Sequence, residues 1–281
     1  MSTKQIQGKL WSIAPQYWSN YFEPFFLPIY KETLERLNLT KEDLLLDAGC
    51  GSGMFSHMAI DTGAHVTGMD AASGLLDVAR ERNHGYNFLE EDLEAMPFAN
   101  EAFDYVTGFN SFQYAGKFTA ALAEAKRVLK PGGRLVLAIW DKAEFSEAAN
   151  ILKAIGTLLP PPPPGTPGPF ALSEDGIIES IIKSQGMKML YASKVSCPFL
   201  YYSLGDAVKS FMGIGPSAIA MNHVSKTQVE KIISDAMQPY HLTEDFYHLQ
   251  NSFLLFIAEK HYTNPKQSKK NKNENNNLKN E

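Results

Sequence analysis

The stretch LLLDAGCGSGMF, residues 44–55, places three glycines at alternate positions directly behind a carboxylate. Its first three leucines form an apolar run that is typical of a strand buried on both faces of a parallel sheet. Glycine tolerates a positive φ and has no Cβ to hold a ligand away. Residues 54–61 then follow with a helical pattern, so strand, glycine turn and helix predict a nucleotide site at the carboxyl ends of an open α/β sheet. The candidate loop residues are Asp47, Gly49, Gly51 and Gly53.

The glycine spacing indicates which nucleotide the loop would bind. A dinucleotide fingerprint, G-x-G-x-x-G/A, needs a small residue at position 54, where this chain has Met54. The third glycine comes one residue early, which disfavours a nicotinamide-dependent oxidoreductase. An acid at the end of the strand repels phosphate and favours a cation, and S-adenosylmethionine carries a cationic sulfonium and an ammonium group. We therefore expect S-adenosylmethionine as cofactor, with a glycine turn that binds nothing as the alternative.

Composition and charge narrow the class of protein. The 281 residues are 44% hydrophobic, which is ample for one α/β domain with insertions, and the net charge of −5 argues against an electrostatic grip on nucleic acid. Two distant cysteines, Cys50 and Cys197, make neither a disulfide framework nor a metal site, so no metal is expected. Neither a secretory leader nor a membrane span is visible, so we expect a cytoplasmic protein. The Lys/Asn-rich stretch 263–281 predicts a disordered tail, and prolines 160–164 predict a spacer.

Acidic residues also follow the next two predicted strands. AHVTGMD, residues 64–70, ends in Asp70 about twenty residues past the glycine loop, where an acid that binds ribose hydroxyls is expected. An ionised carboxylate accepts two hydrogen bonds at once and so matches a vicinal diol, and Ala71 lies beside it. YNFLEED, residues 86–92, ends in Asp92, which is placed to accept from an adenine amino group, with the backbone of Leu93 available to the ring.

A family resemblance rests on five segments between residues 40 and 141. These are LLLDAGCGSG, VTGMD, EEDLEAMPF, FDYVTGFNSFQYAG and AEAKRVLKPGGRLVLAIW. In this order and spacing the chain resembles a class I S-adenosylmethionine-dependent methyltransferase, similar to the small-molecule group that includes the ubiquinone and menaquinone biosynthesis methyltransferases. The resemblance implies a Rossmann-like three-layer αβα sandwich whose seven-stranded, mostly parallel sheet has an antiparallel last strand. KMLYASKV and NSFLLFIAEKH fit the last two strands.

The resemblance also implies which residues hold the cofactor. It assigns Asp47 and the Gly49–Gly53 loop to the methionine half, Asp70 to the ribose, and Asp92 with Leu93 to the adenine. Asn110, at the exit of the fourth strand, matches a position whose backbone lies near the methionine ammonium. No Asn-Pro-Pro-Tyr-type motif and no paired cysteine of cytosine-C5 chemistry is present.

Three regions bear on the methyl acceptor. The aromatic segment before residue 40 predicts a helical lid whose Trp11 and Tyr17 close over the sulfonium, because aromatic faces stabilise cations; a helix packed on the sheet edge is the alternative. Residues 203–248, inserted between the last two strands, predict helices that roof a small-molecule pocket. Gln113 and Trp140, at strand exits, complete the candidate substrate pocket. The expected division is a lid at 1–40, the cofactor-binding domain at 41–262 and the tail.

The function expected from these residues is in-line methyl transfer to the O, C or N atom of a small acceptor. Alignment and desolvation can supply most of the acceleration, so no catalytic base is assigned. A catalytically inactive, cofactor-binding regulatory protein and an RNA methyltransferase are the alternatives. Neither the acceptor nor the oligomeric state follows from the sequence.

Overall fold

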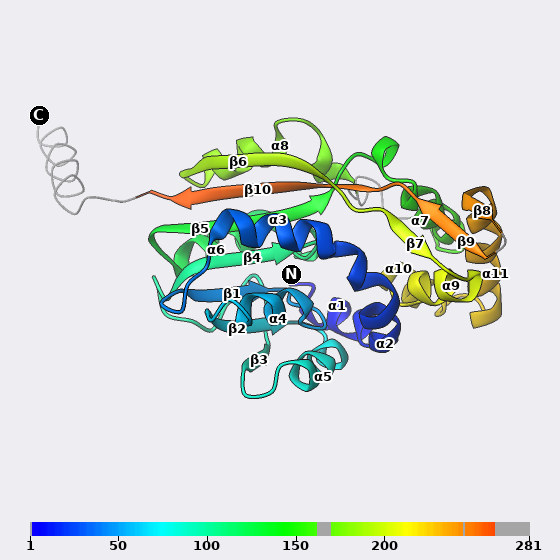
Figure 1. The fold of residues 1–281 in the computed structure, drawn as a ribbon, viewed down its shortest axis with the longest axis horizontal. Coiled ribbons are helices and arrows are strands. Elements are labelled where there is room, and N and C mark those ends of the chain that lie inside the picture. Colours follow the sequence, from blue (N-terminus) through cyan, green and yellow to red (C-terminus); the bar gives the residue numbers. More distant parts are fainter. Residues whose placement is uncertain (1, 162–169, 244, 262–281) are drawn as a thin grey trace, which may run out of the picture.

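A computed structural model describes residues 2–161, 170–243 and 245–261. Its centre is a seven-stranded sheet of order β3-β2-β1-β4-β5-β10-β6 (Figure 1). Of these strands, β10 alone runs antiparallel to its neighbours, β5 and β6. The predicted mostly parallel sheet with an antiparallel last strand is therefore confirmed. The strands are β1 (Leu44–Ala48), β2 (His65–Asp70), β3 (Asn87–Glu90), β4 (Phe103–Phe109), β5 (Leu129–Trp140), β6 (Met187–Ser196) and β10 (Ser252–Lys260).

Helices cover both faces of this sheet. They are α1 (Lys4–Trp11), α2 (Pro15–Tyr17), the π-helix η1 (Trp18–Phe22), the 3-10 helix η2 (Glu23–Phe26), α3 (Leu27–Leu37), α4 (Met54–Ile60), α5 (Ser73–Arg82), α6 (Phe118–Val128), α7 (Ala148–Gly156), α8 (Ile177–Ser184), α9 (Leu204–Met212), α10 (Gly215–Ala220) and α11 (Lys226–Met237). Short 3-10 turns are η3 (Phe112–Tyr114), η4 (Ala143–Phe145), η5 (Ala171–Ser173) and η6 (Gln238–Tyr240).

Strand β5 shows how the alternation of side chains builds the three layers. Leu135 and Leu137 belong to a buried cluster with α6 and α8. Val136 and Ala138 belong to a second cluster with α3, α4 and α7. Successive side chains of a strand point to opposite faces, so one apolar run supplies both halves of the core. The predicted αβα sandwich is confirmed.

The insertion between β6 and β10 contains both helices and strands. Its helices α9 and α11 begin at side-chain caps: Ser203 Oγ accepts from Asp206 N, and Ser225 forms a complete capping box with Gln228. Short strands β7 (Phe199–Tyr201), β8 (His241–Thr243) and β9 (Phe246–Leu249) form a separate three-stranded sheet that the sequence did not predict. In Figure 1 this insertion extends beyond the carboxyl end of β4 and packs against η1 and α7.

The N-terminal segment divides into two parts. Four aromatic side chains, those of Trp18, Phe22, Phe26 and Tyr30, are buried in the main core cluster. Their rings contact one another in series, with Trp18 stacked on Phe22 at 5.0 Å and Phe26 beside Tyr30 at 6.0 Å. Such rings bury large apolar areas, so this part packs onto the protein body, as the alternative to the lid predicts. A lid is therefore proposed only for residues 2–17.

Two further sequence expectations concern regions that the structure describes incompletely. The predicted tail lies outside the described residues, and the predicted spacer at 160–164 lies mostly outside them. Within the described residues, no helix is long and apolar enough to cross a bilayer. In that same part of the chain, no three His, Cys, Asp or Glu side chains are grouped to hold a metal ion.

Candidate functional site

The glycine loop between β1 and α4 requires its three glycines. Gly49, Gly51 and Gly53 have φ values of 81°, 55° and 75°, in the left-handed region that disfavours other residues. At Gly49 a Cβ would also lie 2.2 Å from the Ser111 Cβ. The turn is held against β2, because the amides of Gly49 and Cys50 donate to the Met69 carbonyl at 2.7 and 3.0 Å. The loop therefore presents bare backbone at the end of β1.

Asp47 lies beneath this loop and is 1% exposed. Its carboxylate accepts from Ser56 Oγ at 2.7 Å and from Thr107 Oγ1 at 3.0 Å, which ties β1 to α4 and β4. Burial raises the pKa of Asp47 to about 7. Its side chain does not line the neighbouring pocket, and its contact with a cofactor stays a prediction.

Asp70 supports the loop and also faces the pocket. One carboxylate oxygen accepts from Gly51 N at 2.9 Å, and the other accepts from Ala72 N at 2.9 Å. Burial raises the pKa of Asp70, while these amide donors lower it. Each oxygen keeps a second lone pair, so the carboxylate can still accept from two ligand hydroxyls.

A pocket with about 640 Å³ of empty space, partly open to solvent, lies at the carboxyl ends of β1, β2 and β4. It brings together eight of the predicted residues, which are Trp11, Gly49, Gly51, Asp70, Ala71, Asp92, Leu93 and Asn110. Residues from five separate segments of the sequence thus meet at one edge of the sheet.

Five predicted residues lie outside this pocket. These are Asp47, Gly53, Tyr17, Gln113 and Trp140. Gly53 packs against α5, and Tyr17 lines a second hollow beside α9. The Gln113 amide donates to Asn110 Oδ1. Trp140 is 4% exposed, with its ring 4.3 Å from that of Phe253. None of the described residues of the 203–248 insertion lines this pocket, so the predicted roof is wrong for this cavity. The insertion instead packs behind Trp11 and Trp18, because Gly213 and Gly215 let it approach them closely.

The first turn of α1 closes one side of the pocket. Thr3 Oγ1 donates to the Tyr114 carbonyl at 2.5 Å, and Lys4 Nζ donates to the Glu90 carbonyl at 2.9 Å. Ser2 Oγ donates to the Asp92 carboxylate. These contacts join residues about 90 or more positions apart, and no local sequence pattern points to them. Sequence reasoning therefore missed the lining residues Thr3, Lys4, Gln7, Leu75, Glu91, Phe109, Ser111, Tyr114 and Ala115.

Aromatic rings form the wall beside the glycine loop. Trp11 packs edge-on against Trp18 at 5.0 Å and against Tyr114 at 5.5 Å. Trp18, which the sequence analysis did not assign to the site, occupies the place expected for Tyr17. The π-helical turn of η1 starts at Trp18, and such turns recur at functional sites.

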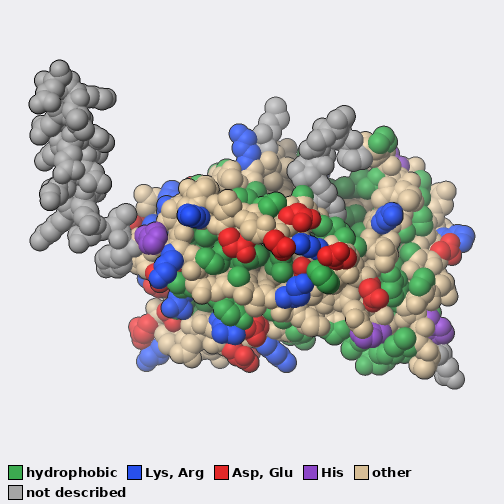
Figure 2. All heavy atoms as spheres, turned by 90° about the horizontal axis from the view of Figure 1, so that it is seen from above, with side chains coloured by type: hydrophobic (Ala, Val, Ile, Leu, Met, Phe, Trp, Pro, Cys, Tyr) green, Lys and Arg blue, Asp and Glu red, His purple; other side chains and the backbone are tan. Residues whose placement is uncertain are grey.

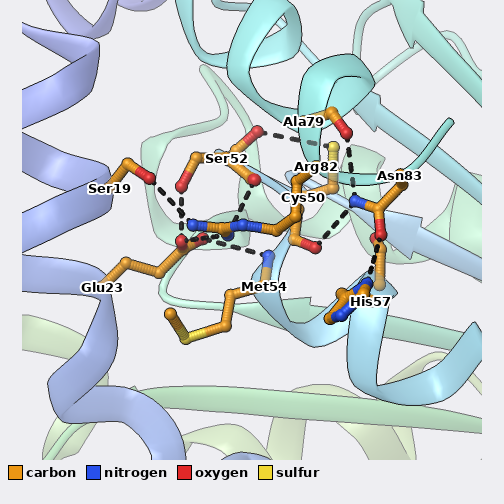
Figure 3. A network of polar contacts seen from close by, with 12 residues as sticks. Ser19, Glu23, Cys50, Ser52, Met54, His57, Ala79, Arg82 and Asn83 are labelled. Atoms are coloured by element: carbon orange, nitrogen blue, oxygen red, sulfur yellow. Dashed lines mark hydrogen bonds and ion pairs between the residues drawn. The ribbon is translucent and has the colours of Figure 1, made fainter. Parts of the chain in front are cut away.

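A buried polar network attaches the aromatic wall to the loop (Figure 3). Glu23, 1% exposed, pairs with Arg82 at 2.7 Å and accepts from Ser52 Oγ. Arg82 also donates to the Ser52 carbonyl and to Ser19 Oγ, both at 2.8 Å. The pKa of Glu23 is raised by burial, and Arg82 opposes that rise. One guanidinium therefore joins η1, η2 and the glycine loop to the last turn of α5.

Residues 46–137 match the methyltransferase domain family. They carry the glycine loop, Asp70, Asp92 and Asn110, whose geometry is described above. This segment is a methyltransferase domain. The resemblance to the class I S-adenosylmethionine-dependent methyltransferases is thereby confirmed, and with it the expected cofactor.

Curated relatives and solved structures resemble the methyltransferase domain to different extents. The malonyl-[acyl-carrier protein] O-methyltransferase of Serratia marcescens is 43% identical over 38% of this chain and 42% of its own length. The malonyl-[acyl-carrier protein] O-methyltransferase of Buchnera aphidicola is 27% identical over 76% of this chain and 81% of its own length. The demethylmenaquinone methyltransferase of Renibacterium salmoninarum is 37% identical over 36% and 43%. The chain thus matches less than half the length of two of these relatives. The YcgJ protein of Bacillus subtilis shares the fold, with a TM-score of 0.57 and 17% sequence identity. The match covers 83% of this chain and 98% of YcgJ.

Proposed function

We propose that this protein transfers the methyl group of S-adenosylmethionine to a small-molecule acceptor. The observation that carries the proposal is the pocket in which the Asp70 carboxylate lies between the bare glycine loop and the Asp92–Leu93 turn. When bound, S-adenosylmethionine supplies an electrophilic methyl group on a cationic sulfonium. We also propose a cytoplasmic location, since Cys50 and Cys197 are both free thiols.

The residues present fit the parts of this cofactor. Asp70 accepts from the ribose hydroxyls, and Asp92 with the Leu93 backbone holds the adenine. The backbone of Gly49 and Gly51 admits the methionine half because no Cβ fills that space. Trp11 and Trp18 line the pocket, where aromatic side chains favour a cation and exclude water.

No proton-accepting side chain is required of the protein. Displacement at the sulfonium proceeds in line, and orientation of the two reactants supplies much of the acceleration. Burial raises the pKa of Tyr114 to about 12. Its phenol therefore stays protonated at neutral pH and serves as a hydrogen-bond donor to an acceptor molecule, not as a base.

A small molecule fits the acceptor role better than RNA does. The net charge is −5. On the face shown in Figure 2, Lys and Arg side chains are interspersed with Asp and Glu and do not gather in one basic patch. The relatives named above act on a malonyl group held by a carrier protein and on demethylmenaquinone. We infer an acceptor of metabolite size, free or carried.

Calorimetry with S-adenosylhomocysteine, the demethylated product, tests the cofactor assignment. We expect micromolar binding by the full chain and at least a tenfold loss for Asp70→Ala, because hydrogen bonds to a charged group are worth about 1.5–3 kcal/mol each. Binding of NAD with no response to S-adenosylhomocysteine would refute the assignment.

Methyl-labelled S-adenosylmethionine added with cell extract tests transfer. We expect label in the small-molecule or carrier-protein fraction. Label confined to RNA would contradict the proposed acceptor, and binding without any transfer would indicate a regulatory protein.

A further inference from the structure

We infer that the indole N–H of Trp18 binds the carboxylate of the cofactor's methionine half and thereby selects ligands that carry an amino-acid tail. The inference rests on the proposed function, because it assigns a recognition role within the same pocket. It concerns a residue outside the glycine loop and outside the segment that matches the methyltransferase domain family.

The inference rests on a buried hydrogen-bond donor, Trp18 Nε1, that has no acceptor. Among the described residues, three buried side-chain polar atoms lack a partner, namely Trp18 Nε1, Gln113 Oε1 and Ser193 Oγ. Of these three residues, Trp18 alone lines the pocket. The residue is 8% exposed, so its N–H is withdrawn from water. Leaving a buried donor unsatisfied costs about 1–3 kcal/mol, which a ligand acceptor would recover.

The position of this N–H identifies the ligand group. A Cβ placed on Gly51 would lie 3.3 Å from Trp18 Nε1, so the donor is beside the bare backbone of the glycine loop. The proposed function places the methionine half there. Within that half, the ammonium and the sulfonium cannot accept a hydrogen bond, whereas the carboxylate can. A charged acceptor also gives the stronger hydrogen bond.

The surrounding structure holds the indole in place for this role. Its ring stacks on Phe22, and Arg82 anchors the next residue by donating to Ser19 Oγ at 2.8 Å. Behind it, a Cβ on Gly213 would lie 2.5 Å from Trp18 N. On another side, the half-buried Trp11 ring packs edge-on against it at 5.0 Å. The donor is thus preorganised and covered.

Two ligands that differ only in the tail test the inference. S-adenosylhomocysteine carries the carboxylate, and 5′-methylthioadenosine has the same nucleoside and thioether without it. Trp18→Phe keeps a ring against Phe22 but removes the N–H. We expect it to weaken S-adenosylhomocysteine about tenfold or more and to leave methylthioadenosine affinity unchanged. Trp11→Phe is the matched control, because Trp11 Nε1 already donates to Gln7 Oε1 at 3.1 Å and should not discriminate between the ligands.

A measurement on the unaltered protein covers the case in which Trp18→Phe does not fold. With ¹⁵N-labelled tryptophan, assigned from Trp11→Phe and Trp140→Phe spectra, we expect the Trp18 indole proton to move downfield with S-adenosylhomocysteine and not with methylthioadenosine.

Equal losses for both ligands in Trp18→Phe, no loss for either, or identical indole shifts would overturn the inference. If the unaltered protein binds neither ligand, the proposed function itself fails. Binding of both ligands with a ratio insensitive to Trp18→Phe removes only the carboxylate assignment.

Discussion

The guanidinium of Arg82 lies 2.7 Å from the carboxylate of Glu23, although 59 residues separate them in the sequence. The carboxylate side chain is 2% exposed and the guanidinium side chain 22%. This pair links the last turn of α5 to the segment that carries the aromatic wall. A buried pair of this kind costs desolvation, so its removal on one side leaves a charge that nothing balances.

Arg82→Leu should therefore destabilise the protein strongly, by about 3–5 kcal/mol. The control is Lys231→Leu in α11, because Lys231 pairs, among the described residues, only with Asp235 and both side chains are exposed. Such exposed pairs contribute about 0–1 kcal/mol. Urea unfolding of both variants measures the difference, and similar losses would show that the Glu23–Arg82 pair contributes no more than a surface pair.

Asp47 should give stability an unusual dependence on pH. Its folded pKa, about 7, lies above the ordinary value of 3.8, so the folded state holds this proton more tightly than the unfolded state does. The contribution is therefore fully present below pH 3.8 and is lost as the pH rises toward 7, by at most about 1.4 kcal/mol per pH unit.

Asp47→Asn should remove this dependence, because an amide has a similar shape but does not titrate. The measurement is the free energy of unfolding between pH 4.5 and 7.5. The difference in stability between variant and parent should move in favour of the variant as the pH rises. A constant difference across that range would mean that Asp47 is ionised throughout.

The lid should be the least protected part of the pocket wall. Residues 2–17 are attached mainly through side chains, namely the hydrogen bonds of Ser2, Thr3, Lys4 and Ser12 and the ring of Trp11, whereas β1 is hydrogen-bonded to strands on both sides. Amide hydrogen exchange should be faster in α1 than in β1 without ligand. It should slow in α1 when S-adenosylhomocysteine is added. Equal protection of α1 and β1 in the free protein would identify the segment as part of the core.

Gly213→Ala should disturb the aromatic wall from behind. The added methyl group would lie 2.5 Å from Trp18 N and 2.8 Å from the Tyr17 carbonyl carbon, and backbone cannot yield as a side chain does. We expect a loss of about 1–3 kcal/mol in thermal or urea unfolding.

Gly205→Ala is the matched control for that substitution, since it adds the same methyl group to the nearby helix α9. There the methyl group would meet only Ser203 Oγ, at 3.7 Å. Alanine is the better helix former by about 1 kcal/mol, so this control should be neutral or stabilising. Equal effects of the two substitutions would argue against close contact between the insertion and η1.

The part of the site that the sequence predicts is the part encoded locally. Asp70, Asp92 and the glycines each follow a short apolar strand, and parallel strands bring their carboxyl ends to one edge of a sheet. The alternation along β5 likewise follows from a single continuous apolar run. For these elements the neighbouring residues determine both the structure and its place.

The remaining wall of the pocket depends on contacts that no local pattern records. Lys4 reaches Glu90 across 86 residues because of the path of the whole N-terminal segment. Trp18 lines the pocket and Tyr17 lines the second hollow, and no local pattern in the sequence distinguishes these two neighbouring aromatic residues. The insertion, predicted as a roof, packs behind that wall through two glycines whose role becomes visible only from the clashes that a Cβ would cause.

The antiparallel direction of β10 has a practical consequence for handling the protein. Lys260, at the end of that strand, donates to the carbonyl of Leu129, where β5 begins, so it lies at the edge of the sheet opposite the pocket. Ser2, in contrast, contacts Asp92 at the pocket rim. A label or surface anchor attached at Lys260 therefore lies away from the pocket opening, whereas one attached at Ser2 would crowd it.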